Sequence, residues 1–335
     1  MSSCSQGQPR TRIGCLPCPG MFTLFDLAAP EELGIHQFQD PGLLGESTEK
    51  SRGIIYTQKA GFLDLAHVRL AIDWSHYFQE QVQQAMLNFD THITLSGMDA
   101  TRYHLKFNYP AQWRAVTPIQ KAALINELSL RTGQRLAYTV LTWHEIITWF
   151  GYRSTVVIPE GPSAFTYDDM ISHVIGLRVA ETAARLPSHL TWDQAVTKAL
   201  DEELRYLGAQ SPEETMTAIE SVEGVWWHDG AVLRRQIETG LDVGSLRPWL
   251  IEDAGRGQIT ASTTLAIPSM DQIGGMDFGD LVEIELESDI TEYDDILSVL
   301  PTKMTRVKPD RDFVMIVDKI RDEMIDSFGA DVGHP

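Results

Sequence analysis

The sequence lacks the features that would assign it to several common classes. No run reaches the roughly 18 apolar residues of a membrane span. Only three of the 335 residues are cysteine, too few for a disulfide-rich scaffold. No block of Lys or Arg forms a basic surface, and the formal net charge is −20. Because nucleic acid binding needs positive charge, we expect no nucleic-acid partner.

The common catalytic motifs are also missing. The sequence has no Gly-x-Ser-x-Gly elbow, no Gly-x-x-x-x-Gly-Lys phosphate loop and no Gly-x-Gly-x-x-Gly after a predicted strand. The composition itself is ordinary for a soluble globular protein, with 43% hydrophobic and 22% charged residues. Any function must therefore be sought in smaller groups of residues.

The hydrophobic pattern predicts an α+β fold with a helix-rich central domain and small antiparallel sheet elements. Helical spacing, together with helix-starting prolines and helix-ending glycines, predicts helices at about 63–87, 118–130, 136–150, 167–186, 191–207, 212–222, 231–239 and 310–327. A hairpin is predicted at 91–95 and 103–109, with further extended segments at 156–158, 264–267 and 281–286. We expect a flexible leader at 1–20, a helix-rich core carrying the site at 21–250, and an α+β extension packed on it at 251–335.

The cysteines suggest a location. Met1–Ser5 resembles the end of a bacterial lipobox, in which small residues precede a cysteine that becomes lipidated, so Cys4 is a candidate membrane anchor. Lipidation of Cys4 would leave Cys15 and Cys18 as a pair that could form a disulfide in an oxidising envelope. The alternatives are an incidental Cys4 in the leader and two free thiols. Both a disulfide and free thiols are favoured over redox catalysis.

Asp64 and His67 form the first candidate site. Spaced three apart on a predicted helix, they project from one face and could hold one metal ion. The alternative is structural: Asp64 at a helix start and His67 as a hydrogen-bonded core residue. Asp73 and His76 repeat this spacing, but they lie about half a turn round the helix and are expected at the surface.

His144 and Glu145 form the second candidate site. The pair begins like the zinc-peptidase motif His-Glu-x-x-His, but Thr148 stands at the second histidine position and the motif fails. A histidine and a glutamate nevertheless remain on an unusually apolar helix, where a glutamate needs a partner or a raised pKa. A structural ion pair and a functional site are both open.

A third segment contributes secondary candidates. Thr166 and Asp169 have the spacing of a capping box, which explains both residues without a function. His173 lies one turn further and could join His67 and His144 as a third imidazole. Such a ligand set suits zinc or iron with an open coordination position.

These segments resemble a known family. The run Gly61–Arg69, the run Thr142–Tyr152 and the segment Ser163–Gly176 occur in the same order as in the bacterial envelope family of unknown function numbered 4056. Many members of that family are predicted lipoproteins. The resemblance implies a periplasmic or lipid-anchored outer-membrane location, with the membrane as partner, but no reaction.

Two functional hypotheses follow, and metal-free acid/base catalysis by Glu145 and His67 stays open as a third. In the first, the chain is a metal-dependent hydrolase of the envelope that acts on a small molecule or envelope component. Asp64, His67 and His144 would bind zinc or iron, and Glu145 would be the catalytic general base that activates water. In the second, the chain is a non-catalytic lipoprotein, a binding or scaffold module in which the same residues form a buried hydrogen-bonded network.

Overall fold

The structure is a computed structural model in which the chain forms two compact units. It describes residues 7–21, 23–39, 48–151, 163–251, 264–268, 272–273, 276–301 and 304–335. The first unit contains Trp74–Ala164 and Pro268–Ile320; the second contains Gly7–Asp73, Phe165–Ile267 and Arg321–Pro335. Each unit thus interleaves distant segments of the chain, whereas the predicted division used consecutive ones.

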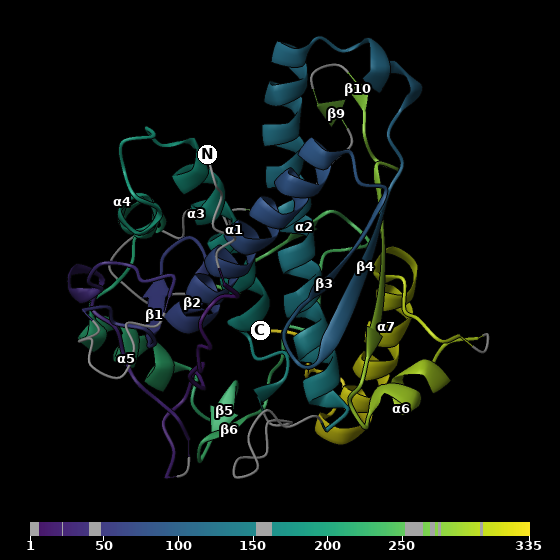
Figure 1. Cartoon of the computed structure of the whole chain (residues 1–335). Coiled ribbons are helices and arrows are strands. Elements are labelled where there is room, and N and C mark those ends of the chain that lie inside the picture. The colour runs from purple at the N-terminus through teal and green to yellow at the C-terminus, as the bar shows by residue number, and fades with distance from the viewer. Residues whose placement is uncertain are drawn as a thin grey trace. The chain divides into compact units, whose positions relative to one another are not determined.

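The predicted α+β fold is confirmed. The α-helices are α1 Leu65–Asn88, α2 Pro118–Trp149, α3 Asp169–Arg185, α4 Trp192–Leu207, α5 Pro212–Ser221, α6 Tyr293–Ser298 and α7 Pro309–Phe328, with short 3₁₀ turns at Pro30–Glu32 and Ala111–Ala115 (Figure 1). The strands are β1 Ile54–Thr57, β2 Gly61–Asp64, β3 His92–Ser96, β4 Thr101–Phe107, β5 Trp227–His228, β6 Ala231–Val232, β7 Ser245–Leu246, β8 Leu265–Ala266, β9 Gln272–Ile273, β10 Met276–Asp277 and β11 Val282–Ser288. They form small antiparallel sheets of two or three strands.

The first unit is built on the sheet β11-β4-β3, whose β3–β4 hairpin is the one predicted from sequence. Strand β4 alternates buried and more exposed residues, as expected for a sheet with one face on a core. Trp143 of α2 lies in that core, stacked on Phe313 with ring centroids 6.0 Å apart. Its Nε1 donates to Oγ1 of Thr101 at 3.0 Å, so the buried indole is satisfied.

Helix α2 is continuous, contrary to the predicted break at Gly133. A Cβ at Gly133 would lie 2.7 Å from the backbone N of Gln79 and 2.8 Å from the backbone O of Ser75. The glycine is thus present because α1 approaches α2 closely, while the surrounding residues keep the helix intact. Thr117 starts the helix with a capping box completed by Gln120, directly before Pro118.

The second unit combines the β1–β2 hairpin, α3, α4 and α5 with the first turns of α1. Gly61, with a φ of 68°, makes the hairpin turn, so Gly61–Asp64 is a strand and α1 begins at Leu65. Helix α3 packs closely on α1 at Gly176, where a Cβ would lie 2.3 Å from the backbone O of Val68. Strand β2 and the starts of α1 and α3 are thereby held together in one unit.

The sequence also predicts a helix at 231–239 and an extended segment at 156–158. Residues 231–239 are not a helix: Ala231–Val232 pairs with Trp227–His228 as the hairpin β5–β6. Asp229 and Gly230, with φ values of 49° and 77°, form its tight turn, which outweighs the helical spacing. The predicted extended segment at 156–158 lies outside the described residues.

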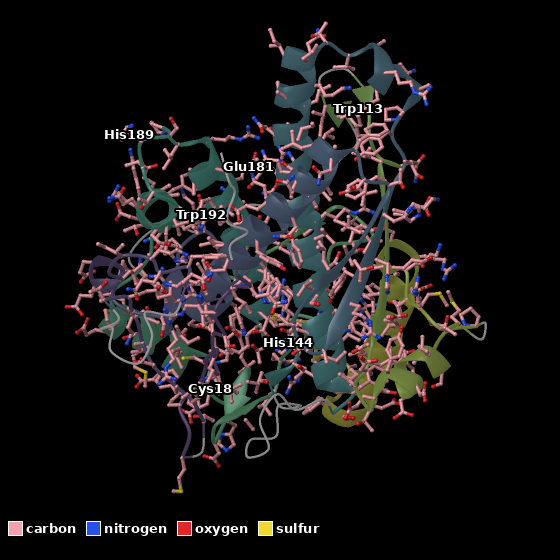
Figure 2. All side chains as sticks on the ribbon, in the orientation of Figure 1. Cys18, Trp113, His144, Glu181, His189 and Trp192 are labelled. Atoms are coloured by element: carbon pink, nitrogen blue, oxygen red, sulfur yellow. The ribbon has the colours of Figure 1, made fainter. Side chains whose placement is uncertain are left out.

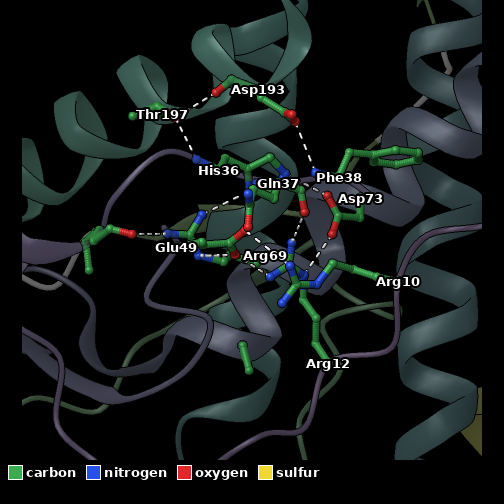
Figure 3. Close-up of polar contacts among 12 residues, drawn as sticks. Arg10, Arg12, His36, Gln37, Phe38, Glu49, Arg69, Asp73, Asp193 and Thr197 are labelled. Carbon is green, nitrogen blue, oxygen red and sulfur yellow. Dashed lines mark hydrogen bonds and ion pairs between the residues drawn. The ribbon is translucent and has the colours of Figure 1, made fainter. Parts of the chain in front are cut away.

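A buried ion network crosses the second unit (Figure 3). Asp73 lies 2.8 Å from Nε of Arg12 and 2.8 Å from Nε2 of His36, while Glu49 pairs with Arg12 and lies 3.0 Å from Nε of Arg69. The side chains of all five residues are essentially inaccessible to solvent. The expected surface position of Asp73 is therefore wrong, because the sequence does not show that two distant segments supply its partners.

Candidate metal centre

The sequence-predicted residues fall in both units. Asp64, His67, Asp169 and His173 belong to the second unit, whereas His144 and Glu145 belong to the first. A cluster with the composition of a metal site forms within the second unit.

Asp64 ends strand β2 and caps helix α1. Its Oδ1 accepts a hydrogen bond from the backbone N of Ala66 at 2.9 Å, and its Oδ2 accepts one from the backbone N of Cys15 at 2.7 Å. The helix-start role foreseen for Asp64 is therefore confirmed. Each carboxylate oxygen has a second lone pair, so these bonds leave Asp64 able to bind a cation as well.

The start of helix α3 brings two more carboxylates. Thr166 donates its backbone N–H to Oδ2 of Asp169 at 2.6 Å, which is half of the predicted capping box. The hydroxyl of Thr166 donates to Oδ1 of Asp168 at 2.7 Å. Ser172 Oγ then links the two elements: it accepts from the backbone N of Asp64 at 2.9 Å and donates to the backbone O of Asp168 at 2.6 Å.

Asp64, His67 and Asp168 come together as a group of possible metal ligands. One ligand atom from each, a ring nitrogen or a carboxylate oxygen, lies within 4.8 Å of the others. Two ligand atoms that each lie about 2.0–2.2 Å from one ion are at most about 4.4 Å apart, so the group is close to the spacing that binding requires. Both carboxylates are fully buried, and His67 is partly exposed.

Asp168 gives the strongest indication that the cluster binds a cation. Its Oδ2 is buried, and no group among the described residues gives it a hydrogen bond. Burial, and then the charges of Asp169 and Asp64, raise the pKa of Asp168 well above its usual value. Burial likewise raises the pKa of Asp64. Buried carboxylates gathered in this way need a proton or a cation, and a divalent ion would satisfy all of them.

Two further groups adjoin the ligands. Nδ1 of His67 lies 3.0 Å from Oδ1 of Asp169, and the rings of His67 and His173 have centroids 5.2 Å apart. A carboxylate beside a metal-binding histidine fixes the ring and its tautomer. Asp169 and His173, the secondary candidates, thus lie beside the cluster. The donor set of two carboxylates and one imidazole fits zinc or iron, as does the buried oxygen of Asp168, to which no described residue donates a hydrogen bond.

Sequence reasoning did not select Asp168. The capping-box spacing of Thr166 and Asp169 explains that segment without a site, so only Asp169 is a candidate from sequence. The available signal was the pair of adjacent acidic residues at a predicted helix start inside an apolar segment, where two carboxylates exceed what capping requires.

His144 and Glu145 lie on helix α2 in the first unit, and His144 is labelled in Figure 2. Nδ1 of His144 lies 2.9 Å from Oδ2 of Asp99, and Glu145 is buried. This carboxylate partner supports the structural alternative for His144. The predicted roles of His144 as a ligand and Glu145 as general base stay predictions.

Cys15 and Cys18 do not form the predicted disulfide. Cys15 and Cys18 are both buried free thiols, packed in an apolar cluster with residues such as Tyr167 and Trp226. Burial raises the pKa of each thiol to about 12, which disfavours the reactive thiolate. Their packing accounts for them without a covalent link. Cys4 lies outside the described residues.

Comparison with known proteins identifies the family. Residues 2–236 match the family described as Protein of unknown function (DUF4056), which covers more than half of the chain. The chain belongs to this family. The match includes every residue of the metal cluster, so the cluster lies in the part of the chain that the family defines. No curated protein and no solved structure gives a significant match. In the described part of the chain, no helix is both long and apolar enough to span a bilayer.

Proposed function

We propose that this DUF4056 protein is a metal-dependent hydrolase of the bacterial cell envelope, with Asp64, His67 and Asp168 as ligands of a zinc or iron ion. The observation that carries the proposal is the buried Oδ2 of Asp168, which has no hydrogen-bond partner among the described residues. A second carboxylate and an imidazole supply the other donors within 4.8 Å. The ligand set differs from the sequence hypothesis, because Asp168 takes the place given there to His144.

Each residue then has a defined task. Asp64 and Asp168 bring negative charge that offsets the charge of the ion, and the imidazole of His67 completes three protein donors, as in many catalytic zinc sites. Asp169 orients His67 through Nδ1. The buried ring of His173 lies beside His67 and would be the neighbouring group that can take up a proton. The ion, when bound, would polarise a substrate oxygen and increase the acidity of water.

Activity assays on reconstituted protein test this proposal. The chain is purified, stripped with a chelator, reloaded with Zn²⁺ or Fe²⁺ and assayed against chromogenic esters, phosphoesters and amides. We expect hydrolysis of at least one class that is lost on stripping, restored on reloading, and absent from Asp168→Asn. The exposed His228→Ala, a histidine substitution outside the cluster, is the control and should retain activity. Equal activity of the stripped and reloaded enzyme would contradict the proposal.

The envelope location is part of the same proposal. Its support is the lipobox-like run ending in Cys4 and the family resemblance noted above. Expression with a radiolabelled fatty acid tests it: label should enter the wild-type protein and be absent from Cys4→Ser. Label that persists in Cys4→Ser, or an unlabelled wild type, would remove the anchor from the account.

A non-catalytic scaffold is the second candidate function. It is favoured by the hydrogen bonds that Asp64 already accepts from Cys15 and Ala66, which show that the cluster is also part of the fold's polar network. In that case Asp168 is held protonated, and added metal leaves the melting temperature unchanged. A metal-dependent rise in melting temperature would reject it, because a ligand stabilises only the state that binds it.

A further inference from the structure

The N-terminal segment Gly7–Met21, here called the strap, lies directly against the proposed metal centre within the second unit. The backbone N of Cys15 donates to Oδ2 of Asp64 at 2.7 Å. An ideal Cβ on Gly14 would stand 2.7 Å from the same oxygen and 2.8 Å from Nε2 of His67. Position 14 therefore adjoins two ligand side chains at once, in a space too small for a methyl group.

The strap is attached to helix α1 at Arg12. Arg12 and Cys15 are buried, whereas Thr11 and Ile13 are exposed. The guanidinium of Arg12 donates from Nε to Asp73 at 2.8 Å and from Nη2 to the backbone O of Gln37 at 3.0 Å (Figure 3). The same guanidinium pairs with Glu49. This forked, buried attachment fixes the strap two residues before Gly14.

We propose that Arg12 and Gly14 are positioning residues of the metal centre, with the strap forming one wall of the coordination sphere. Arg12 holds the strap on α1, and Gly14 lets its backbone close against the ligands. The strap then governs how fast the ion exchanges and how much room remains for a further ligand. This inference rests on the proposed function and assigns a role that the ligand set alone does not.

The glycine requirement comes from space. The φ of Gly14 lies outside the left-handed region, so alanine can adopt its backbone conformation. The atoms that its Cβ would meet are side-chain ends, but those ends have little freedom. Asp64 is fully buried with hydrogen bonds at both oxygens, and His67 is held beside Asp169. Alanine at 14 must therefore displace ligand atoms, and its effect appears in metal affinity.

Zinc titration and release separate these roles. Zn²⁺ affinity is measured by competition with a chromogenic chelator, and release is measured by stopped-flow mixing of the loaded chain with excess EDTA. The variants are Gly14→Ala and Arg12→Lys. The matched controls are Gly7→Ala, whose Cβ would meet, among the described residues, Gln39 Nε2 alone at 4.0 Å, and the exposed strap substitution Ile13→Ala. Circular dichroism checks that each variant is folded.

We expect Gly14→Ala to weaken Zn²⁺ binding by about 10-fold or more, in the range seen for groups that orient metal ligands. Arg12→Lys keeps the charge but loses the forked contact, so release should accelerate by about 10-fold with a smaller change in affinity. Both controls should match the wild type. A wild-type affinity and release rate in Gly14→Ala would overturn the inference, even if Arg12→Lys is recovered unfolded. A wild-type chain that binds no Zn²⁺ would instead overturn the proposed function, and the inference with it.

Discussion

Nδ1 of His67 lies 3.0 Å from Oδ1 of Asp169, and this contact orients the imidazole of the candidate metal centre. The other ring nitrogen, Nε2, faces Gly14, where an added Cβ would stand 2.8 Å from it. Asp169 is itself held by the backbone N–H of Thr166 at 2.6 Å. The helix start of α3 therefore positions a residue of α1, which connects the capping of one helix to the ligand geometry of another.

Substitution of Asp169 tests this connection. Asp169→Asn keeps the size of the side chain and an acceptor for Thr166, but it removes the charge beside His67. We expect Zn²⁺ affinity to fall by about 10–100-fold with little change in fold, as for other carboxylates that support a metal-binding histidine. Isothermal titration with Zn²⁺ measures this, with Asp201→Asn on the exposed face of α4 as control. Equal affinities for the two variants would count against an orienting role.

The buried ion network predicts a large loss of stability. Asp73→Ala leaves Arg12 and His36 buried without their shared carboxylate, which should lower the free energy of unfolding by about 3–5 kcal/mol. Asp201→Ala breaks the exposed pair with Arg205 and should cost less than about 1 kcal/mol. Urea denaturation of both variants gives the comparison. Similar losses of unfolding free energy in the two variants would contradict a larger contribution from the buried network.

The close contact of α1 with α2 predicts that alanine at position 133 will destabilise the protein, although alanine is a good helix former. Alanine is favoured over glycine in a helix by about 1 kcal/mol. At Gly133, however, its Cβ would press on the backbone of Ser75 and Gln79. We expect Gly133→Ala to lower the free energy of unfolding by about 1–3 kcal/mol. Gly333→Ala, whose added Cβ has no atom of the described residues within 4 Å, is the control; a stabilised Gly133→Ala would refute the close approach.

An ion-paired glutamate on the sheet of the first unit predicts that the stability of the protein decreases at low pH. Hydrogen bonds from Arg102, then from Arg306, lower the pKa of Glu287 to about 2. A lowered folded-state pKa contributes stability above the usual value near 4.5, and this contribution is lost as pH falls toward 2. Glu287→Gln should therefore flatten the decline in stability between pH 5 and about 2. Denaturation at several pH values measures this; an unchanged slope relative to the exposed control Glu238→Gln would contradict it.

Local patterns were sufficient for most of the fold. The β3–β4 hairpin, the capped start of α2 at Pro118 and helix α4 all follow from residues within one element. Gly133 shows where such reasoning ends, because a glycine needed for close packing of two helices has the same local signature as a helix break. The contact that distinguishes them involves residues more than fifty positions away.

The site was only partly predictable for the same reason. Asp64 and His67 share one short run, and their spacing was sufficient to select them. Asp168 is separated from them by about a hundred residues, and its significance depends on a buried oxygen to which no described residue donates a hydrogen bond, which only the three-dimensional structure shows. Asp73 likewise became recognisable as buried only when Arg12 and His36 were found around it.

Metal analysis of Asp168→Asn tests the central claim most directly. Wild type and variant are stripped, reloaded with Zn²⁺, freed of excess ion by gel filtration and measured by inductively coupled plasma mass spectrometry, with circular dichroism to confirm folding. The account predicts stoichiometric zinc in the wild type and its loss from the folded variant, because the amide no longer supplies an anionic oxygen. A zinc-free wild type, or a variant that retains as much zinc as the wild type, would contradict it.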